Sequence, residues 1–291
     1  MKIGVHLFVT DQTASLSDLA VELEQRGFES LWVPEHTHIP VSRRSPYLRD
    51  APIPPEYLRC LDPFIALMSA AAVTNELVLG TGVCLIAQHD PITAAKQAAT
   101  LDLLSHGRFK FGIGLGWNIE EMTDHGVDPA TRRSLVREKV LAMKGLWNNE
   151  TFAFDGRFVS FEESWQWPKP VQVGGPPVLL AGAATPRAIR HLAEYADGWI
   201  PDLNFVRFDA MEMAMAEIAE ACVAAGRSAS AIPVSVQSVR AKPADLERLA
   251  GMGVERAIHV LPSAGWDEIR VELDEFQGAA EAAGVMGNVQ S

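Results

Sequence analysis

The stretch MKIGVHLFVTDQTASLSDLAVELEQRGFESLWVP (residues 1–34) predicts a strand, a helix and a second strand in succession. Ile3–Val9 and Ser30–Pro34 are short apolar runs of strand length. Between them, apolar residues recur at the i, i+3, i+4, i+7 spacing of one buried helix face, at Leu16, Leu19, Ala20 and Leu23. The stretch therefore reads as a βαβ unit with a right-handed crossover between parallel strands.

The same alternation continues to the end of the chain. Six further runs of strand length occur at Leu77–Ile86, Phe109–Leu115, Val178–Ala181, Gly198–Ile200, Pro233–Val239 and Ala257–Leu261. Segments with helical spacing lie between these runs. Eight β-then-α units with runs that are apolar on both faces predict an α/β protein with the (β/α)₈ TIM-barrel fold. An open, doubly wound sheet is the alternative.

Local signals add detail to this barrel. Three helices are predicted to begin where an N-cap residue precedes a proline, at Asp62-Pro63, Asp90-Pro91 and Thr185-Pro186. Aromatic residues alternate around Asp155-Gly156, which predicts a small β-hairpin at 151–162, inserted into the barrel. No linker or low-complexity segment divides the chain, so we expect residues 1–291 to form a single domain.

Composition and charge restrict the partners and the cellular location. The chain has 25 basic and 37 acidic residues, a net charge of −12, and should repel nucleic acid and anionic membranes. No apolar stretch is long enough to span a bilayer, and the start does not resemble a secretory signal. Cys60, Cys84 and Cys222 are far apart and show neither a disulfide framework nor a metal-ligand spacing. We expect no metal site and a cytoplasmic location.

Glycines near the ends of two predicted strands suggest that a flat ligand lies against the backbone. The segment Gly112-Ile113-Gly114-Leu115-Gly116 fails as a dinucleotide fingerprint, because the third glycine is replaced by Trp117. Glycine at the end of a barrel strand instead allows close approach of a planar group. We favour this interpretation also for Gly80-Thr81-Gly82-Val83, for which tight packing inside the barrel is the alternative.

The segment Gly182-Ala183-Ala184-Thr185-Pro186 connects a predicted strand to a predicted helix. It offers free backbone N–H groups and the positive end of a helix dipole. Its small side chains leave room for a phosphate group. The segment therefore predicts an anion site.

His36 is the main candidate for proton transfer. It follows the second strand and should point into the barrel mouth, where its neighbour Glu35 is expected to set its protonation state. A structural loop histidine is the alternative. Weaker candidates are His38, His89 and His125. The segment 117–126 contains Asn118 and three acidic residues, Glu120, Glu121 and Asp124. These residues are expected to start a helix, because negative charge near the start of a helix suits its dipole.

The connection from Thr37 to Cys60 is long and rich in proline. Because it follows a strand, we expect it to cover the barrel mouth and to be mobile without ligand. It contains a local group of basic residues, which is either a solvated surface or a site that attracts anions: Arg43, Arg44, Arg49 and Arg59.

Several stretches resemble the luciferase-like flavin and deazaflavin oxidoreductases, in particular the short members that use coenzyme F420. They span most of the first 200 residues: Phe28–His36, Leu79–Val83, Leu101–Phe109, Gly112–Asn118 and Ala193–Trp199. The resemblance implies a barrel that holds the cofactor ring at its strand ends, hydride transfer, and usually a homodimer. It also implies a cis peptide bond at Gly82–Val83 and cofactor phosphates against the segment that begins at Gly182.

We therefore expect an F420-dependent oxidoreductase that moves a hydride between the deazaflavin and a small organic substrate. His36 and Glu35 are the expected catalytic residues. The expected cofactor contacts are Thr81, Gly82, Val83, Gly114, Gly116, Trp117, Asn118, Gly182, Ala183 and Ala184. Two alternatives stay open: an FMN-dependent luciferase-like monooxygenase that uses dioxygen, and a barrel that binds a cofactor without catalysis.

Overall fold

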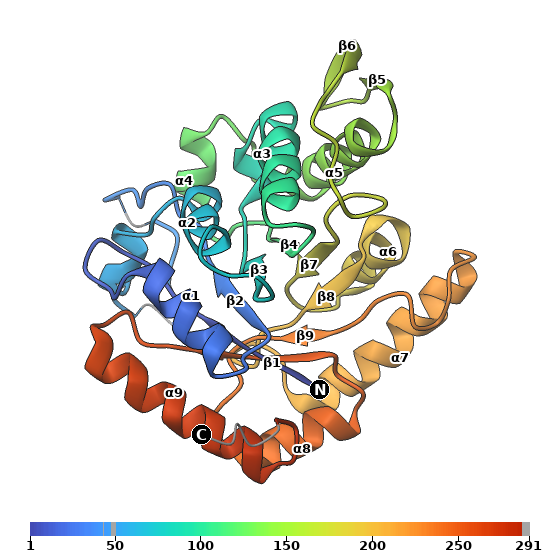
Figure 1. Cartoon of the computed structure of the whole chain (residues 1–291). Coiled ribbons are helices and arrows are strands. Elements are labelled where there is room, and N and C mark those ends of the chain that lie inside the picture. The colour runs from blue at the N-terminus through green and yellow to red at the C-terminus, as the bar shows by residue number, and fades with distance from the viewer. Residues whose placement is uncertain (43, 48–50, 287–291) are drawn as a thin grey trace.

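A ring of parallel strands with helices around it forms the body of the protein (Figure 1). The computed structural model describes residues 1–42, 44–47 and 51–286. The strands of the ring are β1 (Lys2–His6), β2 (Ser30–Val33), β3 (Val78–Thr81), β4 (Phe109–Ile113), β7 (Val178–Ala181), β8 (Gly198–Ile200), β9 (Ser235–Val236) and β10 (Arg256–Val260).

The helices lie outside this ring. They are α1 (Leu16–Gln25), α2 (Pro63–Ala71), α3 (Pro91–Leu104), α4 (Ile119–Asp124), α5 (Arg132–Asn148), α6 (Pro186–Tyr195), α7 (Phe208–Ala224), α8 (Pro243–Gly251) and α9 (Trp266–Ala282), with short 3₁₀ turns η2 (Pro55–Leu58) and η3 (Ile86–Gln88). The sequence predicted the start of α2, α3 and α6 correctly, because the side chains of Asp62, Asp90 and Thr185 each accept a backbone N–H of the first turn.

The sheet closes almost completely. Its order is β8-β7-β4-β3-β2-β1-β10-β9, and all ladders between these strands are parallel. The two end strands meet through isolated parallel bridges, Trp199 with Val234 and Asp202 with Gln237. The predicted (β/α)₈ barrel is therefore confirmed, and the open-sheet alternative is wrong.

Strand β3 differs from its prediction in a way that matters for the site. The apolar run Leu77–Ile86 forms a strand only over Val78–Thr81, after which the chain turns into η3. The predicted cis peptide bond at Gly82–Val83 is confirmed. The regular strand is interrupted by a bend at Gly82, after which Cys84 still pairs in parallel with Ile113 of β4.

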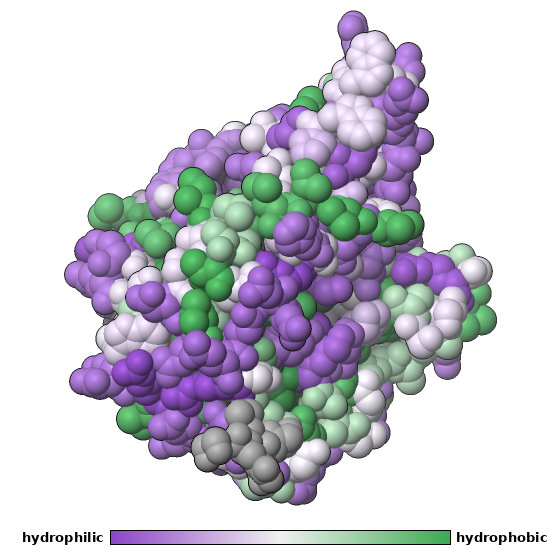
Figure 2. All heavy atoms as spheres, in the orientation of Figure 1, coloured by the Kyte–Doolittle hydropathy of each residue, from purple (hydrophilic) through white to green (hydrophobic). Residues whose placement is uncertain are grey.

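The predicted hairpin is present and slightly longer than expected. It consists of β5 (Thr151–Asp155) and β6 (Ser160–Trp165), which pair antiparallel and project from the body beside α5 (Figure 1). In the space-filling view most of this face is hydrophilic, with small apolar groups below the hairpin (Figure 2). No helix of the described residues is long and apolar enough to cross a membrane.

The barrel interior contains its own small core below the mouth. Trp32, Leu179, Ile200 and Ile258 are buried there, with Val83 and Ala181 packed against them. Gly80 belongs to this core, because a Cβ at its position would lie 2.2 Å from the Trp32 ring. Our ligand-based interpretation of Gly80 is therefore wrong. Its lack of a side chain makes room for Trp32.

Candidate functional site

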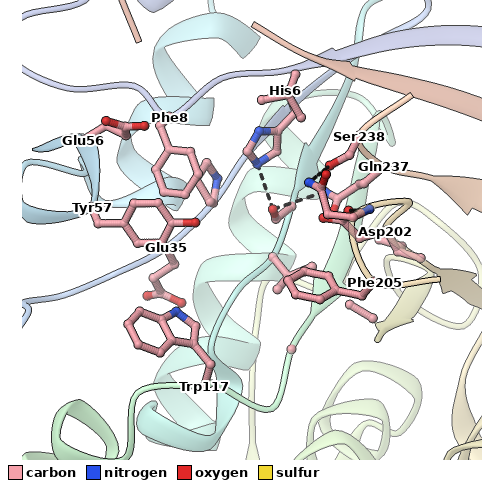
Figure 3. Close-up of a pocket in the computed structure, with 18 of the residues that line it drawn as sticks. His6, Phe8, Glu35, Glu56, Tyr57, Trp117, Asp202, Phe205, Gln237 and Ser238 are labelled. Atoms are coloured by element: carbon pink, nitrogen blue, oxygen red, sulfur yellow. Dashed lines mark hydrogen bonds between the residues drawn. The ribbon is translucent and has the colours of Figure 1, made fainter. Parts of the chain in front are cut away.

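A cavity of about 1190 Å³ opens at the carboxyl ends of the barrel strands. Its walls come from the residues that directly follow the strands and from the long loop after β2 (Figure 3). This is the end of a TIM barrel at which active sites are built. The volume is larger than that of a typical pocket for one drug-sized ligand, about 300–1,000 Å³.

His36 lies in this wall and is held by a carboxylate. Its Nδ1 lies 2.8 Å from Oε2 of Glu121, whose other oxygen accepts the backbone N–H of Thr37 at 3.1 Å. Because a carboxylate can only accept, His36 carries its proton on Nδ1. The indole N–H of Trp117 donates to Nε2 at 3.4 Å, which requires a free lone pair there. His36 therefore presents a basic nitrogen next to the cavity.

The expectation that Glu35 sets the protonation of His36 is wrong. Adjacent residues in extended chain point to opposite sides, so the two side chains diverge. Glu35 instead accepts hydrogen bonds from Nε2 of His89 at 2.6 Å and from the backbone N–H of Leu85 at 2.6 Å. Burial raises the pKa of Glu35, but the hydrogen bonds from His89, Leu85 and Cys84 bring this pKa below its ordinary value. Glu35 is thus an ionised carboxylate that fixes the segment after β3.

Glu35, Cys84 and His89 also have the spacing of a metal site, with possible ligand atoms within 4.8 Å of one another. Burial raises the pKa of the Cys84 thiol well above its ordinary value, so the thiol keeps its proton. Its S–H group donates a hydrogen bond to Glu35. His89 likewise donates to Glu35. The hydrogen bonds within the group account for its geometry without a metal ion.

The peptide after β3 is held from behind by two side chains. The carbonyl oxygen of Gly82 accepts hydrogen bonds from Nε2 of His6 at 2.9 Å and from the amide of Gln237 at 3.2 Å (Figure 3). Burial lowers the pKa of His6 to about 4, although the bond to Gly82 acts in the opposite direction. His6 is therefore neutral at pH 7, and its N–H fixes the position of the Gly82–Val83 peptide.

The predicted cofactor contacts fall into two groups. Six of them line the cavity: Gly82, Val83, Gly114, Gly116, Trp117 and Gly182. Four do not. The Thr81 hydroxyl donates to the carbonyl of Gly112, and Asn118 caps α4 by accepting the N–H of Glu121. Ala183 and Ala184 lie next to Gly182 outside the lining. The first group is still predicted to contact the cofactor.

The long loop supplies residues that the sequence analysis missed. Tyr47 and Tyr57 line the cavity next to His36, and Ser45 ties the loop to α4 through its N–H, which donates to Glu120 at 2.9 Å. Of the basic group, Arg59 pairs with Asp11 and Arg44 lies 3.6 Å from Glu120. Arg43 and Arg49 lie outside the described residues. The two described arginines are paired with carboxylates, which disfavours an anion site.

Polar groups from β8 and β9 form the opposite wall. Asp202, Gln237 and Ser238 lie together there, across the cavity from Tyr57 (Figure 3). Burial raises the pKa of Asp202, and hydrogen bonds from Asn204 and Ser238 partly offset this. These residues were not among the predicted site residues, although Asp202 follows the predicted strand Gly198–Ile200 and the other two lie near the end of the predicted strand Pro233–Val239.

The cavity suits a flat cofactor with a charged tail. Its wall from β3 to β7 contains four glycines, Gly82, Gly114, Gly116 and Gly182, among the side chains of Val83, Leu85, Leu115 and Trp117. A Cβ at Gly182 would meet nothing within 4 Å, so the backbone there faces open space. Arg240, which follows β9, also lines the cavity, and its Nε donates to Asp245 at 3.1 Å. A planar ring against the glycine wall and a phosphate near Gly182 and Arg240 are compatible with these residues.

Comparisons with known sequences place the chain among oxidoreductases. An uncharacterised protein of Mycobacterium tuberculosis (strain H37Rv) is 42% identical over 279 residues, which cover 95% of this chain and 97% of that protein. An F420-dependent hydroxymycolic acid dehydrogenase of the same strain is 26% identical over 86% of this chain and 66% of its own length. The oxygenase component of a flavin-dependent trigonelline monooxygenase of Acinetobacter baylyi is 29% identical over 60% of this chain and 46% of its own length.

Solved structures support the fold. A monooxygenase of Streptomyces bottropensis superposes with a TM-score of 0.79 at 20% identity, covering 96% of this chain and 98% of that one. An F420-dependent secondary alcohol dehydrogenase superposes with a TM-score of 0.75 at 16% identity, covering 97% of this chain and 98% of that one. The sequence profile of the luciferase-like monooxygenase family matches residues 2–291. With this match over almost its whole length, the chain belongs to the luciferase-like monooxygenase family.

Proposed function

We propose that this protein is an F420-dependent oxidoreductase that acts on a small organic substrate. The observation that carries the proposal is the His36–Glu121 pair, which presents an unprotonated Nε2 beside the cavity. Interconversion of an alcohol and a carbonyl compound by hydride transfer requires a group that takes up or returns the hydroxyl proton. His36 can serve as that group, whichever direction the reaction runs.

The residues around His36 support this proton transfer. Glu121 fixes the ring and stabilises the imidazolium that forms when Nε2 takes a proton. The Trp117 indole now occupies Nε2 at 3.4 Å, so a substrate hydroxyl has to replace this weak contact. The hydrogen bonds of Glu35 are with His89 and Leu85 and not with His36, so Glu35 acts as a positioning residue for the segment after β3.

The cofactor would lie on the glycine wall. The Gly82–Val83 peptide would support its ring, with Gly182 and Arg240 near its phosphate. When bound, the deazaflavin supplies a two-electron acceptor or donor for a hydride. The relative that oxidises hydroxymycolic acids with F420 supports this choice of cofactor.

An FMN-dependent monooxygenase is the second candidate, because a flavin-dependent monooxygenase is also among the relatives. Titration of the purified protein with F420 and with FMN, followed by fluorescence, separates the two. We expect F420 to bind at micromolar concentration or below and FMN to bind at least tenfold more weakly. Micromolar binding of FMN without binding of F420 would reject the proposal. Tight F420 binding without turnover of any alcohol would indicate a barrel without catalysis.

We also propose a cytoplasmic homodimer whose partners are small molecules, not nucleic acid or membranes. Trp165, Trp167 and Val173, at and after β6, are exposed by 72%, 58% and 104%. Large exposed apolar side chains of this kind mark a candidate contact surface. Light scattering after size-exclusion chromatography should give twice the mass of the chain, and a monomer at micromolar concentration would contradict the dimer.

A further inference from the structure

The end of the cavity around His36 is built from aromatic rings. We define the aromatic box as the side chains of Phe8, Tyr47, Tyr57 and Trp117. Figure 3 labels Phe8, Tyr57 and Trp117. Phe8 and Tyr57 lie 4.4 Å apart between ring centroids, Tyr47 and Tyr57 5.2 Å, and Tyr47 and Trp117 5.6 Å. The ring of His36 lies 5.1 Å from Tyr57. The proton-transfer group is therefore bordered by flat apolar surfaces from three different segments of the chain.

Two hydrogen-bonding groups of opposite kind face this space. Nε2 of His36 is an acceptor, as its contact with the Trp117 N–H shows. The Tyr57 hydroxyl lies 3.3 Å from that of Tyr47, which donates to it, so the proton of Tyr57 can go to another partner. Burial raises the pKa of Tyr57 well above its usual range, so its hydroxyl keeps this proton. An acceptor and a donor at the same end of the cavity complement a hydroxyl group, which donates once and accepts as well.

Charge and size restrict what the hydroxyl can be attached to. Three carboxylates adjoin the aromatic box, those of Glu35, Glu56 and Glu121. Arg240 follows β9, as do Gln237 and Ser238, which lie across the cavity from Tyr57 in Figure 3. An anionic substrate at the box would lose its hydration next to these carboxylates. The volume of about 1190 Å³ exceeds that of a pocket for one drug-sized ligand.

We infer that the substrate is an uncharged alcohol, or the corresponding carbonyl compound, with a flat apolar group next to the reacting carbon. The flat group packs in the aromatic box, the hydroxyl donates to Nε2 of His36, and Tyr57 donates to the hydroxyl oxygen. Oxidation removes the carbinol hydrogen with two electrons to the oxidised deazaflavin and the hydroxyl proton to His36, which leaves a C=O bond. The inference rests on the proposed function and adds the substrate class to it.

The test compares two ketones that differ in one charge, acetophenone and 4-acetylbenzoate. Each is titrated calorimetrically into the F420-loaded protein, so that binding is measured independently of turnover. We expect acetophenone to bind at least tenfold more tightly, because the carboxylate of 4-acetylbenzoate would lie next to Glu35, Glu56 and Glu121. Equal binding of the two ketones, or tighter binding of 4-acetylbenzoate, would overturn the substrate class.

Tyr57→Phe tests the donor while keeping the ring. Loss of one neutral hydrogen bond should weaken acetophenone binding by about fivefold and leave F420 binding unchanged. Tyr195→Phe, a matched change outside the cavity, should alter neither. Unchanged acetophenone binding in Tyr57→Phe would overturn the role of Tyr57.

The two levels of the proposal fail in different ways. If the protein binds no F420, the proposed function fails, and the same ketone pair is titrated into FMN-loaded and cofactor-free protein. A preference for acetophenone there still supports the aromatic box as a site for uncharged ligands. If F420 binds, reduction of F420 by 1-phenylethanol but not by 4-(1-hydroxyethyl)benzoate supports the inference, and the reverse preference overturns it.

Discussion

Two histidine–carboxylate pairs lie side by side at the barrel mouth, and they differ in what they leave free. In the His36–Glu121 pair the carboxylate binds Nδ1, and Nε2 stays available at the cavity. In the His89–Glu35 pair the carboxylate binds Nε2 itself, and its second oxygen accepts the backbone of Leu85. The same two residue types thus give a proton-transfer group in one place and a structural clamp in the other.

The difference follows from where each carboxylate originates. Glu121 comes from the first turn of α4 and approaches His36 from behind, so that the far nitrogen points to the cavity. Glu35 follows β2 directly and points away from its neighbour His36 toward the segment after β3. The orientation of the histidine ring, and not the mere presence of a carboxylate, decides which pair can do chemistry.

The largest expected effect comes from removing each histidine in turn. His36→Ala should lower kcat by roughly 10²- to 10⁴-fold, the usual range for acid–base catalysis, with little change in cofactor affinity. His89→Ala should lower kcat far less, because His89 has no free nitrogen at the cavity. Steady-state kinetics with F420 measures both. Equal losses in the two variants would remove the distinction between the pairs.

The next largest effect is expected from a change to Glu121, the carboxylate of the His36–Glu121 pair. Glu121→Gln keeps the shape of the side chain but offers one acceptor oxygen where His36 and Thr37 supply two donors. Loss of a charged hydrogen-bond partner should lower kcat by roughly 10- to 100-fold and leave KM nearly unchanged. A rise in KM at constant kcat would instead show that Glu121 acts only in substrate binding.

The carboxylate of the second pair should act mainly on stability. Glu35→Gln should lower the free energy of unfolding at pH 7 by about 1–3 kcal/mol, since the ionised form accepts hydrogen bonds in a buried place. The pKa of Glu35 is below its ordinary value of 4.5, so its stabilisation is present above pH 4.5 and is lost as the pH falls through the folded-state pKa.

Urea unfolding at pH 7 and at pH 4 or below measures this effect. The difference between wild type and Glu35→Gln should be largest at pH 7 and should shrink in acid. A difference that grows as the pH falls would contradict an ionised Glu35.

The smallest expected effect concerns the loop that carries Tyr47 and Tyr57. Ser45 joins it to α4, because the Ser45 hydroxyl donates to Glu120 and accepts the N–H of Ile119. Ser45→Ala should speed tryptic cleavage after Arg44 by roughly threefold. Bound F420 should slow the cleavage in wild type. Identical cleavage rates with and without F420 would count against a loop that closes over the cofactor.

The barrel itself could be predicted because its signal is repeated along the chain. Alternating apolar runs and amphipathic segments specify strand and helix locally, and proline after Asp62 or Asp90 marks helix starts. The end of β3 was less predictable. The apolar run continues to Ile86, but the chain bends at Gly82, which the resemblance to a family indicated and the hydrophobic pattern did not.

The site was only partly predictable. His36 was found because a polar residue directly after a barrel strand faces the mouth. Its partner Glu121 lies 85 residues further along the chain. A place in the first turn of a predicted helix already explained Glu121, so its contact with His36 was not predicted. Tyr47 and Tyr57 were missed although they lie in the long loop, because nothing in the loop sequence shows which of its side chains turn inward.

The distribution of protons in the two pairs is the central claim, and ¹⁵N NMR of the histidine ring nitrogens tests it most directly. Spectra of uniformly labelled protein near pH 7.5, assigned with the His36→Ala and His89→Ala variants, report which nitrogen of each ring carries hydrogen. We expect hydrogen on Nδ1 and a bare Nε2 in His36, and hydrogen on Nε2 in His89. Hydrogen on Nε2 of neutral His36 would contradict it, because that nitrogen could then not accept the proton of a substrate.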